Sequence, residues 1–257
     1  MTPAERSFLD FGGRWVVVTG ASQGIGRACA EELSHNGARI VLIGRNEAKL
    51  EDTRTALSGD GHQVLVLDLT QFDRIHSGVA QLAGQVGRLY GLCHAAGEVA
   101  TQPLSVTTVD VVQRMMAVNV LAGIELARAI SRRDVMDPGG GSLVFISSIY
   151  GHVGVPGETG YSATKGAISA AARAMAMELA RRRIRVNTVS PGFVSTPMTD
   201  TALDILSADQ AAAIKGKHPL GIGTPADVAR AAVFLLAPET TWITGTDMVV
   251  DGGYSAQ

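Results

Sequence analysis

The stretch that decides the fold reads WVVVTGASQGIG and occupies residues 15–26. Its first part, Trp15–Thr19, is a run of β-branched apolar residues, which is typical of a strand buried on both faces. Three glycines follow in the spacing Gly-x3-Gly-x-Gly, and the helical periodicity of Ile25–Asn36 begins among them. Glycines at a strand-to-helix turn let the backbone approach a pyrophosphate, and the first N–H groups of the helix can bind it. A glycine-rich turn that binds nothing is the alternative interpretation.

The same alternation of strand and helix continues to the end of the chain. Short apolar runs alternate with longer segments of 3.6-residue periodicity, a pattern that predicts a parallel sheet with right-handed crossovers. We therefore expect an α/β protein with one doubly wound Rossmann-type domain over residues 1–257, about seven strands and helices on both faces of the sheet. The predicted strands are Trp15–Thr19, Arg39–Ile43, Gln63–Leu67, Leu89–His94, Ser142–Ser147, Arg185–Val189 and Asp247–Val250, and the first helices are Ile25–Asn36, Glu47–Leu57 and Asp73–Ala83.

Composition excludes several classes of protein. With 257 residues, of which 46% are apolar and 18% charged, the chain is neither a disordered tail nor a polyelectrolyte. Its net charge of −2 provides no field that would attract nucleic acid or anionic lipid, so we expect neither as a partner. The N-terminus lacks the layout of a signal peptide, and no run of about 20 apolar residues could span a membrane. We expect a soluble, cytoplasmic protein.

Cysteines and histidines do not form a recognisable metal or disulfide pattern. The two cysteines, Cys29 and Cys93, each lie in an apolar neighbourhood, which argues against a disulfide framework and favours a reducing compartment. The spacing of His94 and His152 to other possible ligands suits no metal site. We expect no metal ion.

The end of the second predicted strand bears on the choice of dinucleotide. A carboxylate about 20 residues past the glycines would bind a ribose 2′-hydroxyl, whereas an arginine accommodates a 2′-phosphate. Residues 40–44 contain no acid and Arg45 follows at once, which favours NADP(H). An ordinary surface arginine is the alternative. Asp68, which closes the third strand, is placed either to meet an adenine edge or to cap the next helix.

A tyrosine and a lysine stand four residues apart, at Tyr161 and Lys165, so on a helix they share one face. A positive charge about 5 Å from a phenol, at an effective dielectric constant of about 20, would lower its pKa by roughly two units. This predicts a Tyr161 that can exchange protons near neutral pH. Ser148 follows the strand Ser142–Ser147 at the carboxyl edge of the sheet, where its hydroxyl can bind a substrate carbonyl.

Taken in order along nearly the whole chain, these motifs resemble those of the short-chain dehydrogenase/reductase family. The segments 191–199 (PGFVSTPMT) and 242–245 (WITG) are most similar to its 3-oxoacyl-(acyl-carrier-protein) reductases. The chain departs from the family at His94, where an asparagine that braces the sheet is usual, so we expect a local difference there. The resemblance rests on the turn Thr19–Gly26, Asn119 within VNV, Ser148, the segment Tyr161–Lys165, Pro191 with Gly192, and the closing segment Asp251–Gly253.

The resemblance implies a role for each matching residue. Tyr161 would be the general acid and base, Lys165 its electrostatic partner and a ribose anchor, and Ser148 would orient the substrate. Asn119 would hold a water that relays protons to Lys165. Residues 197–217 would form a substrate lid. The residues expected to bind the cofactor are Gly20, Ser22, Gln23, Gly24, Ile25, Gly26, Arg45, Asp68, Leu69, Ala96, Gly97, Tyr161, Lys165, Pro191, Gly192, Val194 and Thr196.

The leading functional hypothesis is an NADP(H)-dependent oxidoreductase that reduces a ketone to a secondary alcohol by hydride transfer. A 3-oxoacyl thioester of fatty acid biosynthesis, free or bound to an acyl carrier, is one candidate substrate. An NAD-dependent dehydrogenase of a sugar, steroid or hydroxy acid is an alternative. A non-catalytic nucleotide sensor is another, which the intact set Asn119, Ser148, Tyr161 and Lys165 argues against.

Two further expectations concern surfaces. The helix expected from Gly160 to Ala180 has more small apolar residues than one sheet face can cover, and the family adds a second interface, so we expect a homotetramer. The alanines of this helix include Ala163, Ala167, Ala170, Ala171, Ala174 and Ala176. A separate prediction is that four methionines in apolar helical patterns lie in the core: Met115, Met116, Met175 and Met177. An acidic carrier would dock on Arg132, Arg133 and Arg182 beside the pocket mouth, unless these arginines are ordinary solvated residues.

Overall fold

Seven strands pair in parallel in the order β3-β2-β1-β4-β5-β6-β7, which confirms the expected doubly wound sheet. The computed structural model describes residues 8–197, 199, 212 and 214–256. Most of the predicted lid at 197–217 lies outside the described residues. The strands are β1 (Trp15–Thr19), β2 (Arg39–Gly44), β3 (Gln63–Val66), β4 (Leu89–His94), β5 (Gly141–Ile146), β6 (Ile184–Pro191) and β7 (Asp247–Val250).

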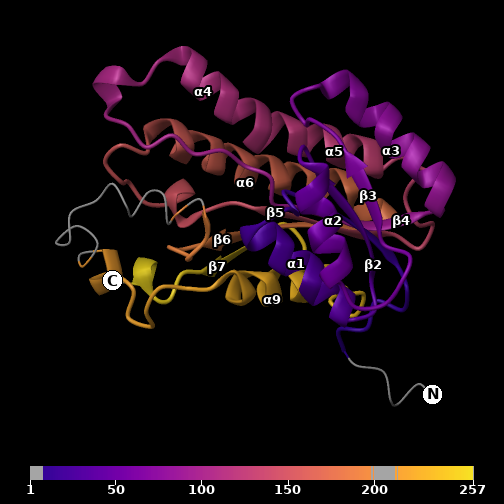
Figure 1. The fold of residues 1–257 in the computed structure, drawn as a ribbon. Coiled ribbons are helices and arrows are strands. Elements are labelled where there is room, and N and C mark those ends of the chain that lie inside the picture. The colour runs from indigo at the N-terminus through magenta and orange to yellow at the C-terminus, as the bar shows by residue number, and fades with distance from the viewer. Residues whose placement is uncertain (1–7, 198, 200–211, 213, 257) are drawn as a thin grey trace.

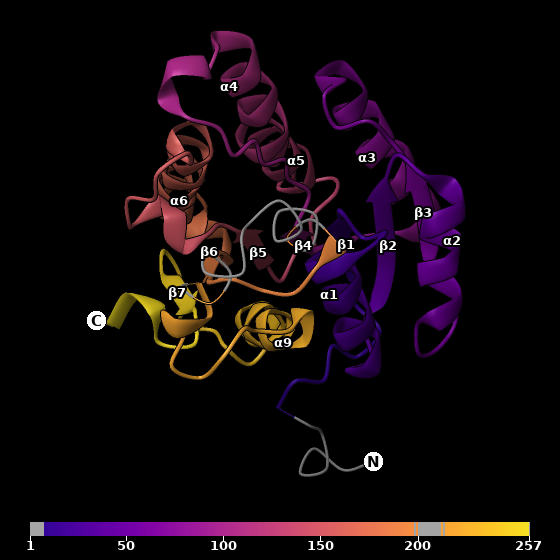
Figure 2. The ribbon, with the colours of Figure 1, turned by 60° about the vertical axis from the view of Figure 1, so that its left-hand side comes forward.

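Helices cover both faces of this sheet, as Figures 1 and 2 show. Helices α1 (Gly24–His35), α2 (Glu47–Ala56) and α9 (Pro225–Leu236) lie on one face. The other face carries α3 (Phe72–Val86), α4 (Val109–Met116), α5 (Ala122–Ile130) and α6 (Thr159–Leu179). A five-residue π-helical segment, η3 (Ala117–Leu121), joins α4 to α5, and short 3-10 turns lie at η2 (Leu104–Val106), η4 (Ile149–Gly151), η5 (Ala180–Arg182) and η6 (Tyr254–Ala256).

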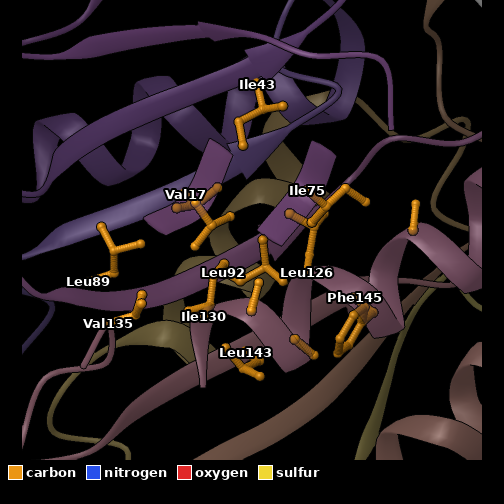
Figure 3. Close-up of a cluster of buried hydrophobic side chains, with 14 of the residues drawn as sticks. Val17, Ile43, Ile75, Leu89, Leu92, Leu126, Ile130, Val135, Leu143 and Phe145 are labelled. Carbon is orange, nitrogen blue, oxygen red and sulfur yellow. The ribbon is translucent and has the colours of Figure 1, made fainter. Parts of the chain in front are cut away.

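Side chains of β1 alternate between two hydrophobic cores. Val17 packs beneath α3 and α5 in the cluster drawn in Figure 3, which also contains Leu92 and Phe145. Val16 and Val18 belong to the cluster under α1 and α9. All three valines are completely buried, as expected for a central parallel strand that helices cover on both sides. No described helix is long and apolar enough to cross a membrane.

The strand order creates a crevice between the carboxyl ends of β1 and β4. The chain leaves β1 toward one face of the sheet and leaves β4 toward the other, so their loops diverge, and such a switch point is where open α/β sheets bind ligands. Gly20 lies at this point with a φ of +63°, and a Cβ atom there would be 2.8 Å from the backbone nitrogen of Ala96. Only glycine lets the two loops approach so closely.

Candidate active site

A cleft of about 310 Å³ opens at the carboxyl ends of β1, β4, β5 and β6. Every residue that the sequence predicted to bind the cofactor lines it, from Gly20 in the first turn to Thr196 after β6. The structure thus brings together segments spread between residues 20 and 199. Pro197 and Thr199, from the predicted lid, also line the cleft. Sequence reasoning missed several further lining residues, although most of them adjoin a predicted one: Gly44, Leu67, Ala95, Glu98, Val118, Ile146 and Ser147.

The turn before α1 has the shape and polarity that a pyrophosphate requires. A Cβ atom at Gly26 would lie 2.3 Å from the carbonyl oxygen of Gly20, so the helix packs against the turn without space for a side chain. The N-cap Gln23 makes no side-chain capping bond and the first turn of α1 has no acidic residue. By contrast, Asn46 caps α2 and Thr224 caps α9. The N-terminus of α1 therefore has its N–H groups and its dipole available for an anion.

The end of the cleft next to β2 and β3, where the sequence predicts that adenosine binds, carries Arg45 and Asp68. Arg45 is exposed and Asp68 is half-buried. Asp68 accepts hydrogen bonds from the backbone and hydroxyl of Thr70, at 3.0 and 2.8 Å, and these bonds, with a contribution from Arg45, lower the pKa of Asp68. The N-cap of α3 is Gln71, so Asp68 stabilises the turn before the helix and also lines the cleft.

The three polar side chains expected at the reacting centre meet at one end of the cleft. Ser148 lies two residues past the end of β5 and η4 begins after it, while Tyr161 and Lys165 lie one turn apart on α6. The Ser148 side chain accepts a hydrogen bond from the backbone nitrogen of Tyr150 at 3.2 Å and lies near enough to the Tyr161 phenol to lower its pKa. The Lys165 ammonium donates to the main-chain carbonyl of Ile146 at 2.8 Å and lies 5.4 Å from the centre of the Tyr161 ring.

The protonation of this pair differs from the sequence-based expectation. Burial is the largest effect and raises the pKa of Tyr161, the charge of Glu158 raises it further, and the nearby Ser148 side chain only partly opposes them. Burial also lowers the pKa of Lys165 to about 8. The predicted depression of the Tyr161 pKa by Lys165 is therefore wrong for the protein alone, because desolvation penalises both charged forms.

Asn119 lies in the π-helical segment and does not line the cleft itself. Its amide nitrogen donates to the carbonyl of Glu98 and to the hydroxyl of Thr164, both at 2.9 Å, and its amide oxygen accepts from the Glu98 nitrogen at 2.7 Å. These bonds fix the loop after β4 against α6. The π-helical widening, which local sequence pattern does not reveal, is a recurrent feature of functional sites.

His94 occupies the place of the family's usual asparagine and also bridges neighbouring elements. Its Nδ1 lies 2.9 Å from the Thr19 hydroxyl and its Nε2 lies 3.3 Å from the carbonyl of Val118. Burial, followed by the charge of Lys165, lowers the pKa of His94 to about 4. The imidazole is neutral at pH 7, so it can donate through one nitrogen and accept through the other. Across the described part of the chain, no group of three or more His, Cys, Asp and Glu residues could hold a metal ion.

The arginines expected to dock an acidic carrier lie at the wrong edge of the sheet. Arg132 and Arg133 stand in the turn before β5, where the carbonyl of Val135 accepts from Leu89, the first residue of β4. This is the amino edge, opposite the cleft. Arg132 forms an ion pair with Asp134 at 2.5 Å. Arg182 donates to the main-chain carbonyl of Ser131 in the same region. The expectation that they flank the pocket mouth is wrong.

Comparison with known proteins agrees with this geometry. Residues 20–255 match the family described as enoyl-(acyl carrier protein) reductase. A glucose 1-dehydrogenase from Gluconobacter oxydans is 35% identical over 95% of this chain and 92% of its own length. A 3-oxoacyl-(acyl-carrier-protein) reductase from Haemophilus influenzae is 34% identical over 94% of this chain and 98% of its own. The solved structure of a short-chain type dehydrogenase/reductase from Mycobacterium ulcerans has a TM-score of 0.89 and 30% identity, and covers 96% of this chain and 92% of its own.

The chain belongs to the short-chain dehydrogenase/reductase family, and it resembles the 3-oxoacyl-(acyl-carrier-protein) reductases within it. It is thus an oxidoreductase of a family that uses a nicotinamide cofactor, NAD or NADP.

Proposed function

We propose that the protein is an NADP(H)-dependent reductase that converts a ketone to a secondary alcohol. The observation that carries this proposal is the meeting of Ser148, Tyr161 and Lys165 in one cleft, which is lined by every residue expected to hold the dinucleotide. NADPH, when bound, supplies a hydride to the carbonyl carbon. The chain's own residues then stabilise and protonate the carbonyl oxygen of the substrate.

The hydroxyls of Ser148 and Tyr161 both donate to the carbonyl oxygen as negative charge grows on it, and Tyr161 gives up its proton. Lys165 keeps a positive charge within 5.4 Å of the ring on which phenolate forms. Asn119 holds the adjoining loop in place through Glu98. A water at Asn119 that restores the proton through Lys165 is part of this proposal.

The preference for NADP(H) is supported by Arg45, which lines the cleft immediately after β2 with no carboxylate on the preceding strand. Its guanidinium suits a 2′-phosphate, which a carboxylate would repel. Asp68 acts against this preference. Its carboxylate lies near enough to Arg45 for the arginine charge to lower its pKa, so it would also repel a 2′-phosphate bound by Arg45. The expected cofactor residues at the end of β6 and just after it, Pro191 with Gly192, Val194 and Thr196, would surround the nicotinamide.

Two classes of substrate are candidates for this site. A 3-oxoacyl thioester agrees with the name of the Haemophilus relative, and a sugar agrees with that of the Gluconobacter relative, a glucose 1-dehydrogenase. Their identities to this chain, 34% and 35%, do not separate the candidates. We propose one catalytic domain over residues 1–257, whose lid at 197–217 would select between them.

A homotetramer is the proposed assembly. Helix α6 turns Ala172 and Ala176 toward the sheet and exposes Ala163, Ala170 and Ala174. Met177, which was expected in the core, is 78% exposed in line with these alanines, because it lies on the face of the helix away from the sheet. Trp242, near the last strand, is 98% exposed. Apolar surfaces of this kind commonly mark subunit interfaces.

A cytoplasmic location is supported by the state of the two cysteines. Cys29 and Cys93 are both buried free thiols, and the proximity of Cys93 together with burial raises the pKa of Cys29. Free thiols suit a reducing compartment.

The proposal is tested by following NADPH oxidation with a panel of ketones, diketones, ketoses and a 3-oxoacyl thioester. NADPH-dependent reduction of at least one of them supports it. Oxidation of alcohols with NAD alone would favour the second candidate, and turnover of none, with tight dinucleotide binding, would favour a sensor.

A further inference from the structure

A second hollow, of about 270 Å³, lies at the amino edge of the sheet, opposite the cleft. Three arginines line it, and they come from the starts of three neighbouring strands. Arg39 is the first residue of β2, while Arg14 and Arg88 directly precede β1 and β4. In the sheet, Trp15 pairs with Arg39 on one side and with Leu89 on the other. Since neighbouring strands lie about 4.8 Å apart, the three arginines start from backbone positions within about 10 Å of one another.

Main-chain carbonyls hold each of these guanidinium groups. Nη1 of Arg14 donates to the carbonyl of Phe11 at 3.0 Å, and Nε of Arg39 donates to that of Gly13 at 2.9 Å. Nη1 of Arg88 donates to a carbonyl of the turn before β5 at 2.6 Å. A guanidinium has more N–H donors than these bonds use, so each arginine keeps donors for a further acceptor. All three arginines are exposed, so a ligand can reach them from solvent.

Two buried aromatic rings also line the hollow and support two of the arginines. The guanidinium carbon of Arg39 lies 5.0 Å from the ring centre of Trp15. That of Arg14 lies 5.5 Å from the ring centre of Tyr90. The rings and the main-chain bonds together restrict these side chains, so an anion that binds them loses little affinity to the ordering of side chains.

No carboxylate neutralises this group of cations. None of the three arginines forms an ion pair within the part of the chain that the structure describes. Asp137 is the one acidic residue among the described lining residues, and its Oδ1 accepts from the backbone nitrogen of Gly139 at 2.8 Å. Asp134, in the turn before β5, is paired with Arg132. Like charges that share a hollow repel one another, and a bound anion removes that cost.

We infer that this hollow binds the phosphate group of a small molecule, at a site separate from the dinucleotide cleft. The inference goes beyond the proposed function and does not depend on it. A phosphate presents three oxygen atoms in a tetrahedral arrangement, which suits guanidinium groups that come from three strands, whereas a carboxylate presents two oxygens in one plane. The arginines surround a hollow and not a flat surface, which favours a small ligand over the surface of a protein.

Calorimetric titration with pyrophosphate, in the presence of saturating NADP+, measures this binding while the dinucleotide occupies the cleft. We expect one pyrophosphate to bind per chain. Arg39→Gln and Arg88→Gln should each raise its Kd by about 10-fold or more, because each removes hydrogen bonds between a charged donor and a charged acceptor. Arg88→Lys keeps the charge but loses the planar fork, so its Kd should lie between those of Arg88→Gln and the unmodified protein.

Arg230→Gln, the same chemical change at an exposed arginine on α9, serves as the control and should leave the Kd unchanged. Circular dichroism of each variant without ligand verifies that the fold is kept. Equal Kd values for the unmodified protein and the variants at Arg39 and Arg88 would overturn the inference. So would the absence of binding to the unmodified protein at millimolar pyrophosphate.

Competition with NADP+ separates this hollow from the cleft. If NADP+ displaces pyrophosphate and the variants at Arg39 and Arg88 bind it normally, the anion binds at the turn before α1 and the inference is wrong. If the protein binds no NADP+, the proposed function fails, but the comparison of the arginine variants still decides whether the hollow binds an anion.

Three further probes test the chemical class of the ligand: inorganic phosphate, glycerol 3-phosphate and citrate. Both phosphates should compete with pyrophosphate. Tighter binding of glycerol 3-phosphate would identify an organic phosphate as the ligand, and tighter binding of inorganic phosphate would identify the free ion. Tighter binding of citrate than of either phosphate would overturn the assignment to a phosphate group.

Discussion

Lys165 is held 5.4 Å from the centre of the Tyr161 ring by a hydrogen bond to the backbone and not by one to the phenol. Lys165 is 5% exposed, and its ammonium donates to the carbonyl of Ile146 at the end of β5. The strand thus fixes the distance between the charge and the phenol. Keeping a cation in this buried position lowers the free energy of unfolding whenever Lys165 is protonated.

Replacing Lys165 should change how stability depends on alkaline pH. Burial lowers the pKa of Lys165 from 10.5 to about 8, so between these values the unfolded chain binds more protons than the native protein. Stability should therefore rise with pH over this range, by up to about 3 kcal/mol. In Lys165→Met this rise should be absent. Urea unfolding at several pH values measures the difference, and parallel curves for the two proteins would count against a buried, charged Lys165.

His94 should make the protein sensitive to acid. Its pKa falls from 6.5 to about 4 in the native protein, so below about pH 6.5 the unfolded chain binds more protons and stability falls. The loss should reach about 3 kcal/mol by roughly pH 4. His94→Asn, which does not titrate, should lose less stability over the same range in urea unfolding. If acid weakens both proteins equally, the imidazole is not the responsible group.

The cofactor preference should respond to a single carboxylate at the end of β2. A Cβ atom at Gly44 would lie 3.2 Å from the end of the Leu50 side chain, which can move, so Gly44→Asp should fold. We expect it to lower the ratio of kcat/KM for NADPH over NADH by about 10-fold or more, since a carboxylate repels the 2′-phosphate. Gly44→Ala controls for the contact with Leu50. Equal use of NADPH and NADH by the unmodified protein would refute the preference itself.

A charge on the exposed face of α6 should weaken the tetramer. Ala170 is exposed in line with Ala174 and Met177, so in a tetramer Ala170→Glu would bury an unpaired carboxylate. Light scattering should give a smaller assembly for this variant. Ala80→Glu, on the exposed side of α3, is the matched control and should keep the original mass. A monomer of the unmodified protein at micromolar concentration would contradict the proposed assembly.

Much of the fold follows from local pattern. Central parallel strands read as continuous β-branched runs, and both Trp15–Thr19 and Asp247–Val250 have the bounds that their sequences predict. The residues at the strand ends could be assigned to one cleft because the carboxyl ends of parallel strands meet at one edge. The π-helical segment around Asn119 was not predictable, since an apolar helical pattern continues through it.

Other features depend on contacts between distant segments or on burial. The hydrogen bond from the Thr101 hydroxyl to the Glu158 carboxylate joins residues 57 positions apart in the chain. The raised pKa of Tyr161 depends on how deeply the phenol is desolvated, which spacing to Lys165 does not report. The misplacement of Arg132 was avoidable, because a segment between a helix and the next parallel strand lies at the amino edge.

The most direct test of the central claim is the kcat of Tyr161→Phe on a ketone that the unmodified protein reduces, measured together with the dissociation constant for NADPH. The account predicts a fall in kcat of about 10²–10⁴-fold, the usual contribution of a general acid, with NADPH bound as tightly as before. A kcat close to that of the unmodified protein would contradict it, because the carbonyl oxygen would then receive its proton without Tyr161.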